Sequence, residues 1–268
     1  MPGDGVRVHY DALESRYGTH AAERALKMGE ALYEVLVGAT VHDMRGVLTP
    51  LKEWSYGLKR NIEIGRFDTE SYMQALDKIF MQVTFLERLL NDMSAYSRQQ
   101  SQDRRPERFA DLIQEAQMLV QDGLGGWLIR SGPVDLTIRV EENVTVEAAR
   151  HQLVLALANV LRNAYEAFER LDGTYEDGKI ELAAEAWGEE LRVTVSDTGM
   201  GMDEADLEAV REFVPGRTSK KNRGTGFGLP IAQKSIKAHG GTMEIHSELD
   251  VGTTITMRLP LYRKKEGI

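Results

Sequence analysis

Two long segments with helical apolar spacing constrain the fold of this chain more than any other feature of its sequence. Within residues 21–64, apolar residues recur in steps of three and four, at Ala25, Met28, Leu32, Val35 and Ala39. Residues 69–97 repeat the pattern at Leu76, Ile79, Val83, Leu86, Leu90 and Met93. Such spacing places apolar side chains on one stripe of a helix. Because the break "GRFDTE" is short and offers Asp68 or Thr69 as an N-cap, the two helices are predicted to form a hairpin.

A single hairpin of this kind has little core of its own. A second copy of the chain would bury both apolar stripes in a four-helix bundle, so the sequence predicts a homodimer through the helical hairpin. The predicted dimerisation hairpin spans residues 21–105. Residues 1–20, which are mixed in character and contain two early glycines, are predicted to be an N-terminal tail.

The stretch "VHDMRGVLTP", residues 41–50, interrupts the pattern of the first helix. An interior glycine costs about 1 kcal/mol relative to alanine, and an interior proline costs about 3 kcal/mol. The upstream stripe extends to His42 and Gly46, whereas the downstream stripe runs through Met44, Val47, Leu51, Trp54 and Leu58. Pro50 lacks the N–H that would bond the carbonyl of Gly46. The sequence therefore predicts a bend just after His42.

Composition sets the broad class of the protein. The chain has 268 residues, enough for two domains of ordinary size. Its net charge of -9 argues against nucleic acid as the main partner, because that usually requires a basic face. The absence of cysteine excludes disulfides, thiol catalysis and thiolate metal sites. No apolar run approaches the length of a membrane span, so the chain is predicted to be cytoplasmic.

Residues 106–268, which follow the polar linker "SRQQSQDRRPERF", are predicted to form a second domain. Helical patterns occupy residues 109–121, 150–171 and 229–239. Strand patterns occupy residues 134–140, 178–187, 190–197, 241–248 and 252–261. Helices and mostly antiparallel strands in this order indicate an α+β class, with an α/β sandwich of one sheet and helices on one face.

Polar residues at two places in this domain have the spacing of ligand-binding groups. Asn159 and Asn163 are four residues apart on a helix and share one face, from which amide oxygens can reach a ligand and its Mg²⁺. Asp197 follows the apolar strand "LRVTV" and precedes Gly199 and Gly201. A carboxylate there can accept a hydrogen bond from an adenine amino group, and the glycines allow a close backbone approach. Taken alone, the asparagines could be exposed polar residues and the aspartate an ordinary turn residue.

The stretch "GTGFGLPIAQ" is a glycine run that ends at a helix start. Its glycines are Gly224, Gly226 and Gly228, with Thr225 and Leu229 among them. Free N–H groups and the helix dipole at such a helix start both favour anions, so the run is a candidate phosphate cradle. Taken alone, a glycine run is weak evidence for such a cradle, because flexible loops are also rich in glycine.

A basic stretch precedes the glycine run in this otherwise acidic protein. Residues 202–223 contain several cations, including Arg217 and Lys220. Cations beside a phosphate cradle can contact the outer phosphates, although a solvated loop is the commoner reason for such a stretch. The order and spacing of all four features together predict a nucleotide site.

This order of motifs resembles the N, G1, lid and G2 elements of the ATP-binding GHKL fold shared by histidine kinases, gyrase, Hsp90 and MutL. The resemblance covers residues 109–262. The stretch "FVPGRTSKKNRGTGFGLPIA" is similar to the lid of nitrogen-regulator-type sensor kinases, with Gly216 and Arg217 in place of an aromatic pair. The resemblance implies ATP and Mg²⁺ as cofactors, with Asn163 as the metal ligand. The implied ATP-binding residues are Asn159, Asn163, Asp197, Gly199, Gly201, Arg217, Lys220, Gly224, Thr225, Gly226, Gly228 and Leu229.

In the first half, "HDMRGVLTPL" resembles the "H-E-L-R-N-P-L-T" phosphoacceptor box of histidine kinases, and with the hairpin this resemblance covers residues 21–98. It implies that His42 attacks the γ-phosphate of ATP and that Asp43 accepts the imidazole proton. Gly46 stands where the family often has Asn or Thr, a position linked to dephosphorylation of the partner, and Val47 follows it in place of the usual proline.

The function implied is a histidine protein kinase that autophosphorylates His42 and passes the phosphoryl group to an aspartate of a response-regulator receiver domain in two-component signalling. One alternative is a degenerate kinase that acts as an ATP-binding scaffold or dimeric switch. Another is a GHKL-type ATPase or anti-sigma serine kinase. Gyrase and Hsp90 carry a general-base glutamate where this chain has Asn159, and an amide cannot act as that base. The hairpin with His42 argues against the anti-sigma type.

Overall fold

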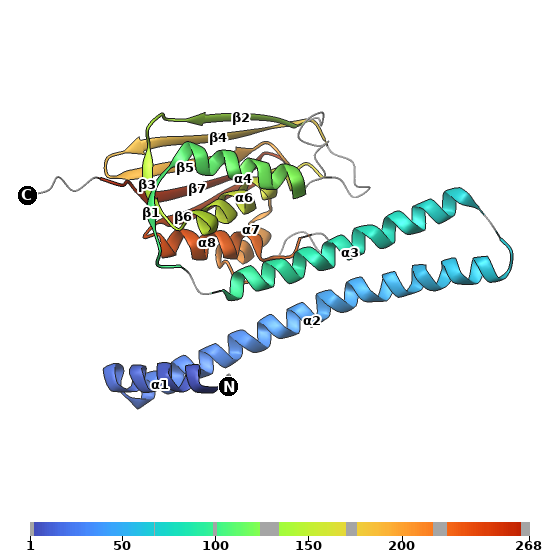
Figure 1. The fold of residues 1–268 in the computed structure, drawn as a ribbon, viewed down its shortest axis with the longest axis horizontal. Coiled ribbons are helices and arrows are strands. Elements are labelled where there is room, and N and C mark those ends of the chain that lie inside the picture. The colour runs from blue at the N-terminus through green and yellow to red at the C-terminus, as the bar shows by residue number, and fades with distance from the viewer. Residues whose placement is uncertain are drawn as a thin grey trace, which may run out of the picture. The chain divides into compact units, whose positions relative to one another are not determined.

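The chain divides into two compact units in the computed structural model, Met1–Leu86 and Glu87–Ile268 (Figure 1). The structure describes residues 3–66, 68–98, 101–123, 134–169, 176–216 and 224–263. Helix α3 (Thr69–Ser97) crosses the division, so its last turns belong to the second unit. The predicted domain division between residues 105 and 106 lies further along the chain and stays a prediction.

The first unit is helical. It contains α1 (Gly3–Tyr17), α2 (Thr19–Glu63) and the first part of α3. Gly65, with a φ of +70°, lies in the turn between α2 and α3, a backbone conformation that glycine adopts without steric cost. Asp68 then accepts hydrogen bonds from the backbone N–H groups of Glu70 and Ser71, each at 3.3 Å. The predicted hairpin helices and the predicted N-cap at Asp68 are therefore present.

Helix α1 was not anticipated. Residues 1–20 are predicted from the sequence to be a tail, whereas Gly3–Tyr17 is helical and contacts α2. The early glycines Gly3 and Gly5 weaken the helical signal, because glycine is a poor helix former. Gly18, at a φ of +84°, separates α1 from α2.

Helix α2 runs without interruption for 45 residues, and Pro50 lies inside it. Gly46, four residues earlier, is exposed, and a Cβ added there would meet nothing within 4 Å. The helix therefore continues past Pro50 despite the missing N–H. A bend just after His42 stays a prediction.

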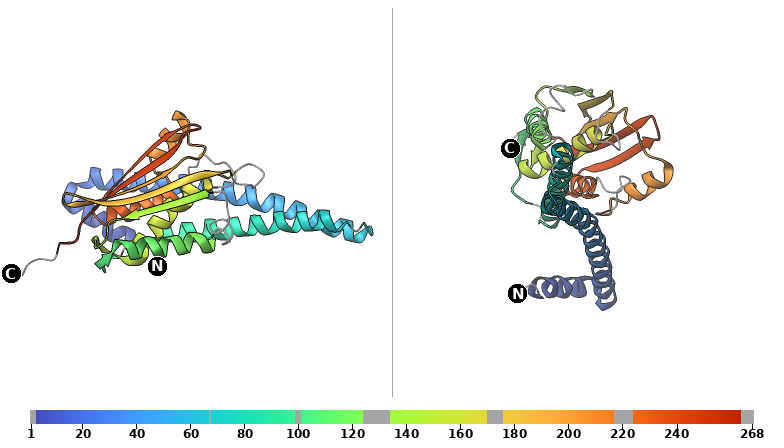
Figure 2. Two further views of the ribbon diagram at one scale, coloured as in Figure 1. Left: turned by 90° about the horizontal axis from the view of Figure 1, so that it is seen from above. Right: turned by 90° about the vertical axis from the view of Figure 1, so that its right-hand side faces the viewer.

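The second unit is built on a five-stranded sheet in the order β2-β4-β5-β7-β6. Its strands are β2 (Val134–Val140), β4 (Gly178–Trp187), β5 (Glu190–Asp197), β6 (Thr242–Glu248) and β7 (Gly252–Pro260). Strand β2 is parallel to β4, and the other neighbouring pairs are antiparallel. The strands splay progressively across the sheet in both views of Figure 2, which is the usual twist of a β-sheet.

Helices cover one face of this sheet, as predicted. They are α4 (Phe109–Gly123), α6 (Arg150–Glu166) and α8 (Gly228–Ala238), with α6 contacting both α4 and α8 (Figure 1). Strand β4 shows why one face is covered, because Ile180, Leu182 and Ala184 are buried while the alternating Glu181 is exposed. The three buried residues of β4 pack in one core with Leu153, Leu157 and Leu161 of α6. The predicted α+β class is confirmed.

Three elements of the second unit were missed by the sequence analysis. Strands β1 (Arg105–Arg108) and β3 (Thr145–Ala148) form a two-stranded antiparallel sheet, and each has only four residues. Helix α7 (Glu204–Arg211) lies within the stretch that was interpreted as a basic lid. Its N-cap is Asp203, whose side chain accepts a hydrogen bond from the Asp206 N–H at 2.8 Å.

In the described ranges, no helix is both long enough and apolar enough to cross a membrane.

Candidate functional site

A pocket opens in the second unit between α6, the end of β5 and the start of α8. Helix α6 contributes Asn163 and Glu166, and β5 contributes Asp197 at its last position. The glycine-rich loop and the first turn of α8 form another wall, with Gly224, Thr225, Gly226, Gly228, Leu229 and Pro230. Most of the residues singled out from the sequence thus line one pocket.

Asp197 is fixed by backbone groups from two directions. Its Oδ1 accepts hydrogen bonds from the N–H of Gly199 at 3.0 Å and from the N–H of Thr253 at 3.2 Å. Both contacts hold the carboxylate at the end of β5, where it lines the pocket. The pocket therefore has an acceptor in a defined place.

The two glycines that follow Asp197 have different surroundings. Gly201 lines the pocket at a φ of +60°, and a Cβ there would lie 1.9 Å from the carbonyl oxygen of Glu248. Gly199 is not among the residues that line the pocket. A Cβ on Gly199 would lie 2.5 Å from the Cβ of Ala167, so this glycine allows the chain to pass closely over the end of α6.

The asparagine pair lies beside the start of α8. A Cβ added to Gly228 would lie 3.6 Å from Oδ1 of both Asn159 and Asn163. Asn163 lines the pocket, whereas Asn159 is buried and lies behind the lining. The guanidinium of Arg162 donates a hydrogen bond to Oδ1 of Asn159. The structure therefore gives the two amides different surroundings, although they share one helix.

The N-terminal turn of α8 lies in the lining of the pocket. The first intrahelical bond runs from the N–H of Ile231 to the carbonyl of Phe227, at 2.9 Å. The N–H groups of Gly228 and Leu229 precede that bond, and Pro230 has no N–H. Together with the helix dipole, this geometry favours a bound anion.

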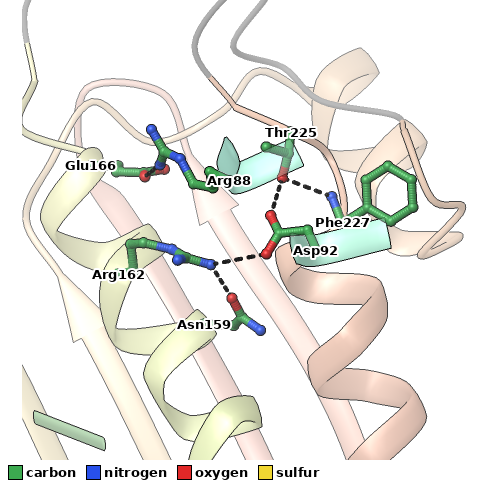
Figure 3. Close-up of polar contacts among 7 residues, drawn as sticks. All are labelled: Arg88, Asp92, Asn159, Arg162, Glu166, Thr225 and Phe227. Carbon is green, nitrogen blue, oxygen red and sulfur yellow. Dashed lines mark hydrogen bonds and ion pairs between the residues drawn. The ribbon is translucent and has the colours of Figure 1, made fainter. Parts of the chain in front are cut away.

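Charged residues beyond those predicted from the sequence line the pocket or lie behind it, and they contact one another (Figure 3). Arg88, near the end of α3, lines the pocket, and its terminal nitrogen lies 2.6 Å from Oε1 of Glu166. Asp92, one turn further along α3, is buried and accepts a hydrogen bond from the Thr225 hydroxyl at 2.6 Å. Its other oxygen lies 3.8 Å from the Arg162 guanidinium.

The end of α3 also contacts α8 through aromatic groups. The Tyr96 ring meets the Phe227 ring edge-on, with centroids 6.0 Å apart. The Lys234 ammonium lies 4.9 Å from the centroid of Tyr96 and donates to the carbonyls of Tyr96 and Arg98. Burial lowers the pKa of Lys234 and raises the pKa of Tyr96. The last turns of α3 are thus fixed beside the glycine-rich loop.

Four of the predicted site residues cannot be placed at this pocket. His42 and Asp43 lie in α2, in the first unit, and their side chains fall outside the described part of the structure. Arg217 and Lys220 lie between the described ranges 176–216 and 224–263. Among the described residues, no group of three or more His, Asp or Glu side chains forms a metal site. The roles predicted for these residues remain predictions.

A mixed sheet covered by helices on one face, with a glycine-rich helix start beside an asparagine pair, defines an ATPase-type nucleotide domain. Residues 148–263 match the model of the family described as histidine kinase-, DNA gyrase B-, and HSP90-like ATPase. The match of this part of the chain, together with relatives named as sensor kinases, supports a catalytic core of the histidine kinase type.

Curated relatives extend the likeness beyond the matched domain. The nitrogen regulation protein NtrY of Azorhizobium caulinodans is 28% identical over 232 residues, covering 84% of this chain and 28% of the relative. The signal transduction histidine-protein kinase AtoS of Escherichia coli is 25% identical over 265 residues, covering 96% of this chain and 39% of the relative. The chain thus spans well under half the length of these relatives.

Solved structures resemble this chain over most of its length. The histidine kinase ThkA, in complex with the response regulator protein TrrA, has a TM-score of 0.66 at 24% identity, covering 94% of this chain and 66% of that one. The histidine kinase AdeS of Acinetobacter baumannii has a TM-score of 0.56 at 17% identity, covering 83% and 98%. At these identities the likeness concerns the fold alone.

Proposed function

We propose that this chain is an ATP-dependent protein-histidine kinase that phosphorylates its own His42. The observation that carries the proposal is that Asp197, Asn163 and the residues at the start of α8 line one and the same pocket. Adenine recognition, metal binding and phosphate binding are the three tasks of an ATP site. Each has a chemically suitable group in this pocket.

The proposed binding mode assigns one part of ATP to each group of the pocket. The Asp197 carboxylate, held by the N–H groups of Gly199 and Thr253, accepts a hydrogen bond from the adenine amino group. The triphosphate extends toward Gly228 and Leu229, whose N–H groups donate to it. The amide oxygen of Asn163 would hold Mg²⁺, which prefers oxygen ligands and would neutralise phosphate charge.

The reaction is an in-line transfer from ATP to an imidazole nitrogen. A neutral His42 ring forms the N–P bond while the bond from the γ-phosphorus to the bridging oxygen of ADP breaks. Asp43 takes the ring proton, and ADP leaves. Asn159 supports transfer to a protein nucleophile over hydrolysis, because it is buried, accepts from Arg162 and has no basic group to activate water.

We further propose that the hairpin forms a homodimer. Leu76 and Val83, two members of the α3 stripe, are 51% and 40% exposed in the single chain. A stripe of this kind loses exposed apolar surface when two hairpins form a four-helix bundle. The bundle is also the surface proposed to receive a response-regulator receiver domain, whose aspartate accepts the phosphoryl group. A complex of this class is known for ThkA, which shares the fold.

Incubation with γ-labelled ATP and Mg²⁺ tests the proposal. The wild type is compared with His42→Gln and with His151→Gln, a matched control at an exposed histidine of α6. We expect acid-labile, alkali-stable label on the wild type and on His151→Gln, and none on His42→Gln. ATP binding without label would instead support an ATP-binding scaffold. Steady phosphate release without a phosphoprotein would support an ATPase.

A further inference from the structure

One positively charged side chain in the pocket lining, that of Arg88, comes from α3, a helix that lies outside the matched family domain. Among the described residues that line the pocket, Arg88 and Arg162 are positively charged, and Glu166 and Asp197 are negatively charged. Arg88 belongs to α3, 60 positions before the first residue of the matched range 148–263. Its side chain is 29% exposed, so it is a partly buried group at the pocket wall.

The two arginines differ in their contacts. Arg162 donates to the buried Asn159 and lies 3.8 Å from Asp92, so it is directed at the protein behind the pocket. Arg88 makes its described contact through one terminal nitrogen, 2.6 Å from Glu166 (Figure 3). A guanidinium carries five N–H donors in a planar fork, so one such contact leaves donors for a second acceptor.

The negative charge of Glu166 requires a positive partner in this pocket. Its side chain is 11% exposed and lines the pocket in which the triphosphate is proposed to bind. A carboxylate buried there without a partner would repel a polyanion and would itself be destabilised. The Arg88 guanidinium neutralises that charge and adds a donor group that suits phosphate oxygens.

Contacts of the following turns of α3 hold the helix, and with it Arg88, in place. Asp92, four residues on, accepts the Thr225 hydroxyl of the glycine-rich loop at 2.6 Å, and residues four apart lie on one helix face. Tyr96, a further four residues on, packs against Phe227. The same face of α3 therefore presents Arg88 to the pocket and is anchored to the loop that lines it.

We propose that Arg88 binds the phosphates of the nucleotide while it neutralises Glu166. The inference rests on the proposed function for the identity of the ligand, and it makes α3 part of the ATP site. The side chain is a nucleotide-binding group that the motifs of residues 148–263 do not include. The contribution of Arg88 to the binding free energy grows with the number of phosphates on the nucleotide, and it is absent for the nucleoside.

Titration calorimetry of the full chain with adenosine, ADP and ATP, each with Mg²⁺, tests this assignment. Arg88→Gln removes the charge while keeping most of the stem, and Arg88→Lys keeps the charge. Arg139→Gln is the matched control, because Arg139 also lies 2.6 Å from a glutamate, Glu181, but on the exposed sheet away from the pocket lining.

We expect Arg88→Gln to lower ATP affinity by about 10- to 100-fold, the size of a charge-assisted hydrogen bond, and adenosine affinity by less than about twofold. Arg88→Lys recovers part of the loss, and the control resembles the wild type. Equal losses for adenosine and ATP, or no loss for ATP, would overturn the inference.

A second variant is expected to change ATP affinity in the opposite direction. Glu166→Gln removes the competing carboxylate, so we expect it to raise ATP affinity relative to adenosine, and a fall like that of Arg88→Gln would count against the inference. Phosphate-dependent binding by a wild type that never labels His42 would refute the proposed kinase while leaving Arg88 assigned. A wild type that binds no ATP would refute both.

Discussion

The helical hairpin and the sheet domain bury their apolar residues in different ways. In the described part of the first unit, Ala22 and Val47 are buried, while larger side chains such as Leu48, Tyr56 and Phe80 are exposed. The second unit encloses a continuous core, in which Leu157, Leu161, Leu182, Leu191 and Ile236 are almost fully buried. The sheet domain therefore completes its core within one chain, whereas the hairpin leaves apolar surface that a partner can cover.

The largest expected effect concerns the core of the sheet domain. Leu182→Ala removes a side chain that is fully buried on β4, and we expect it to lower the free energy of unfolding by about 2–5 kcal/mol. Leu48→Ala, at a leucine of α2 that is 50% exposed, should change it by less than about 0.5 kcal/mol. Urea unfolding followed by circular dichroism measures both. Similar losses for the two variants would show that the hairpin has a core of its own.

The next effect concerns association of the hairpin. Leu76→Asp combined with Val83→Asp places two charges on the exposed α3 stripe, so we expect the dimer Kd to weaken by about 100-fold or more. Leu119→Asp, at an exposed leucine of α4, is the control and should leave the Kd unchanged. Sedimentation equilibrium measures the Kd. An unchanged Kd in the double variant would mean that the stripe is not the dimer interface.

A smaller effect is expected where α3 meets the glycine-rich loop. Asp92→Asn weakens the acceptor of the Thr225 hydroxyl and removes the charge that faces Arg162. We therefore expect the free energy of unfolding to fall by about 1–3 kcal/mol. Amide hydrogen exchange at residues 224–228 should also become faster. Asp103→Asn, at an exposed aspartate paired with Arg105, is the control. If exchange in the loop stays at the wild-type rate, Asp92 does not hold it.

The smallest expected effect is a pH dependence of the unfolding free energy of the sheet domain. His239 is buried, its Nε2 accepts the Ala149 N–H at 3.0 Å, and its Nδ1 lies 2.7 Å from the Ser235 carbonyl, which fits a neutral ring with the proton on Nδ1. Burial lowers the pKa of His239 below its ordinary value of 6.5. The unfolded chain therefore binds a proton first as pH falls, and the folded state loses stability below pH 6.5 until its own lower pKa is reached.

The expected loss from His239 is at most about 1.4 kcal/mol per pH unit, the slope of one proton. Because carboxyl groups also titrate as pH falls, the quantity to measure is the difference in unfolding free energy between wild type and His239→Gln from pH 7 downward. We expect that difference to shrink as the pH falls below 6.5. A difference that stays constant with pH would show that the ring does not titrate differently in the two states.

The sequence predicted those features that depend on local periodicity or on consecutive residues. The two hairpin helices, the strands of the large sheet and the helix that begins at the glycine run are all of this kind. It missed β1 and β3, because four-residue strands carry no readable alternation. It also missed α7, because the cap at Asp203 was hidden in a stretch that was interpreted through its cations.

The polar contacts at the pocket could not have been predicted in the same way. Asp92 and Thr225 are 133 residues apart, and Arg88 and Glu166 are 78 residues apart. Within the sequence, Arg88 and Asp92 look like ordinary polar residues beside an apolar stripe. Only the packing of α3 against the loop and α6 brings them together. The motif residues mark the pocket, but the charges behind it depend on the tertiary fold.

Locating the transferred phosphate tests the central claim most directly. The full chain is incubated with Mg²⁺ and ATP, digested at neutral to alkaline pH, and its phosphopeptides are sequenced by mass spectrometry. The account predicts phosphate on the imidazole of His42 in the wild type and in His151→Gln, and no phosphopeptide in His42→Gln. Phosphate on another residue, or ATP turnover by a chain that never carries phosphate, would contradict it.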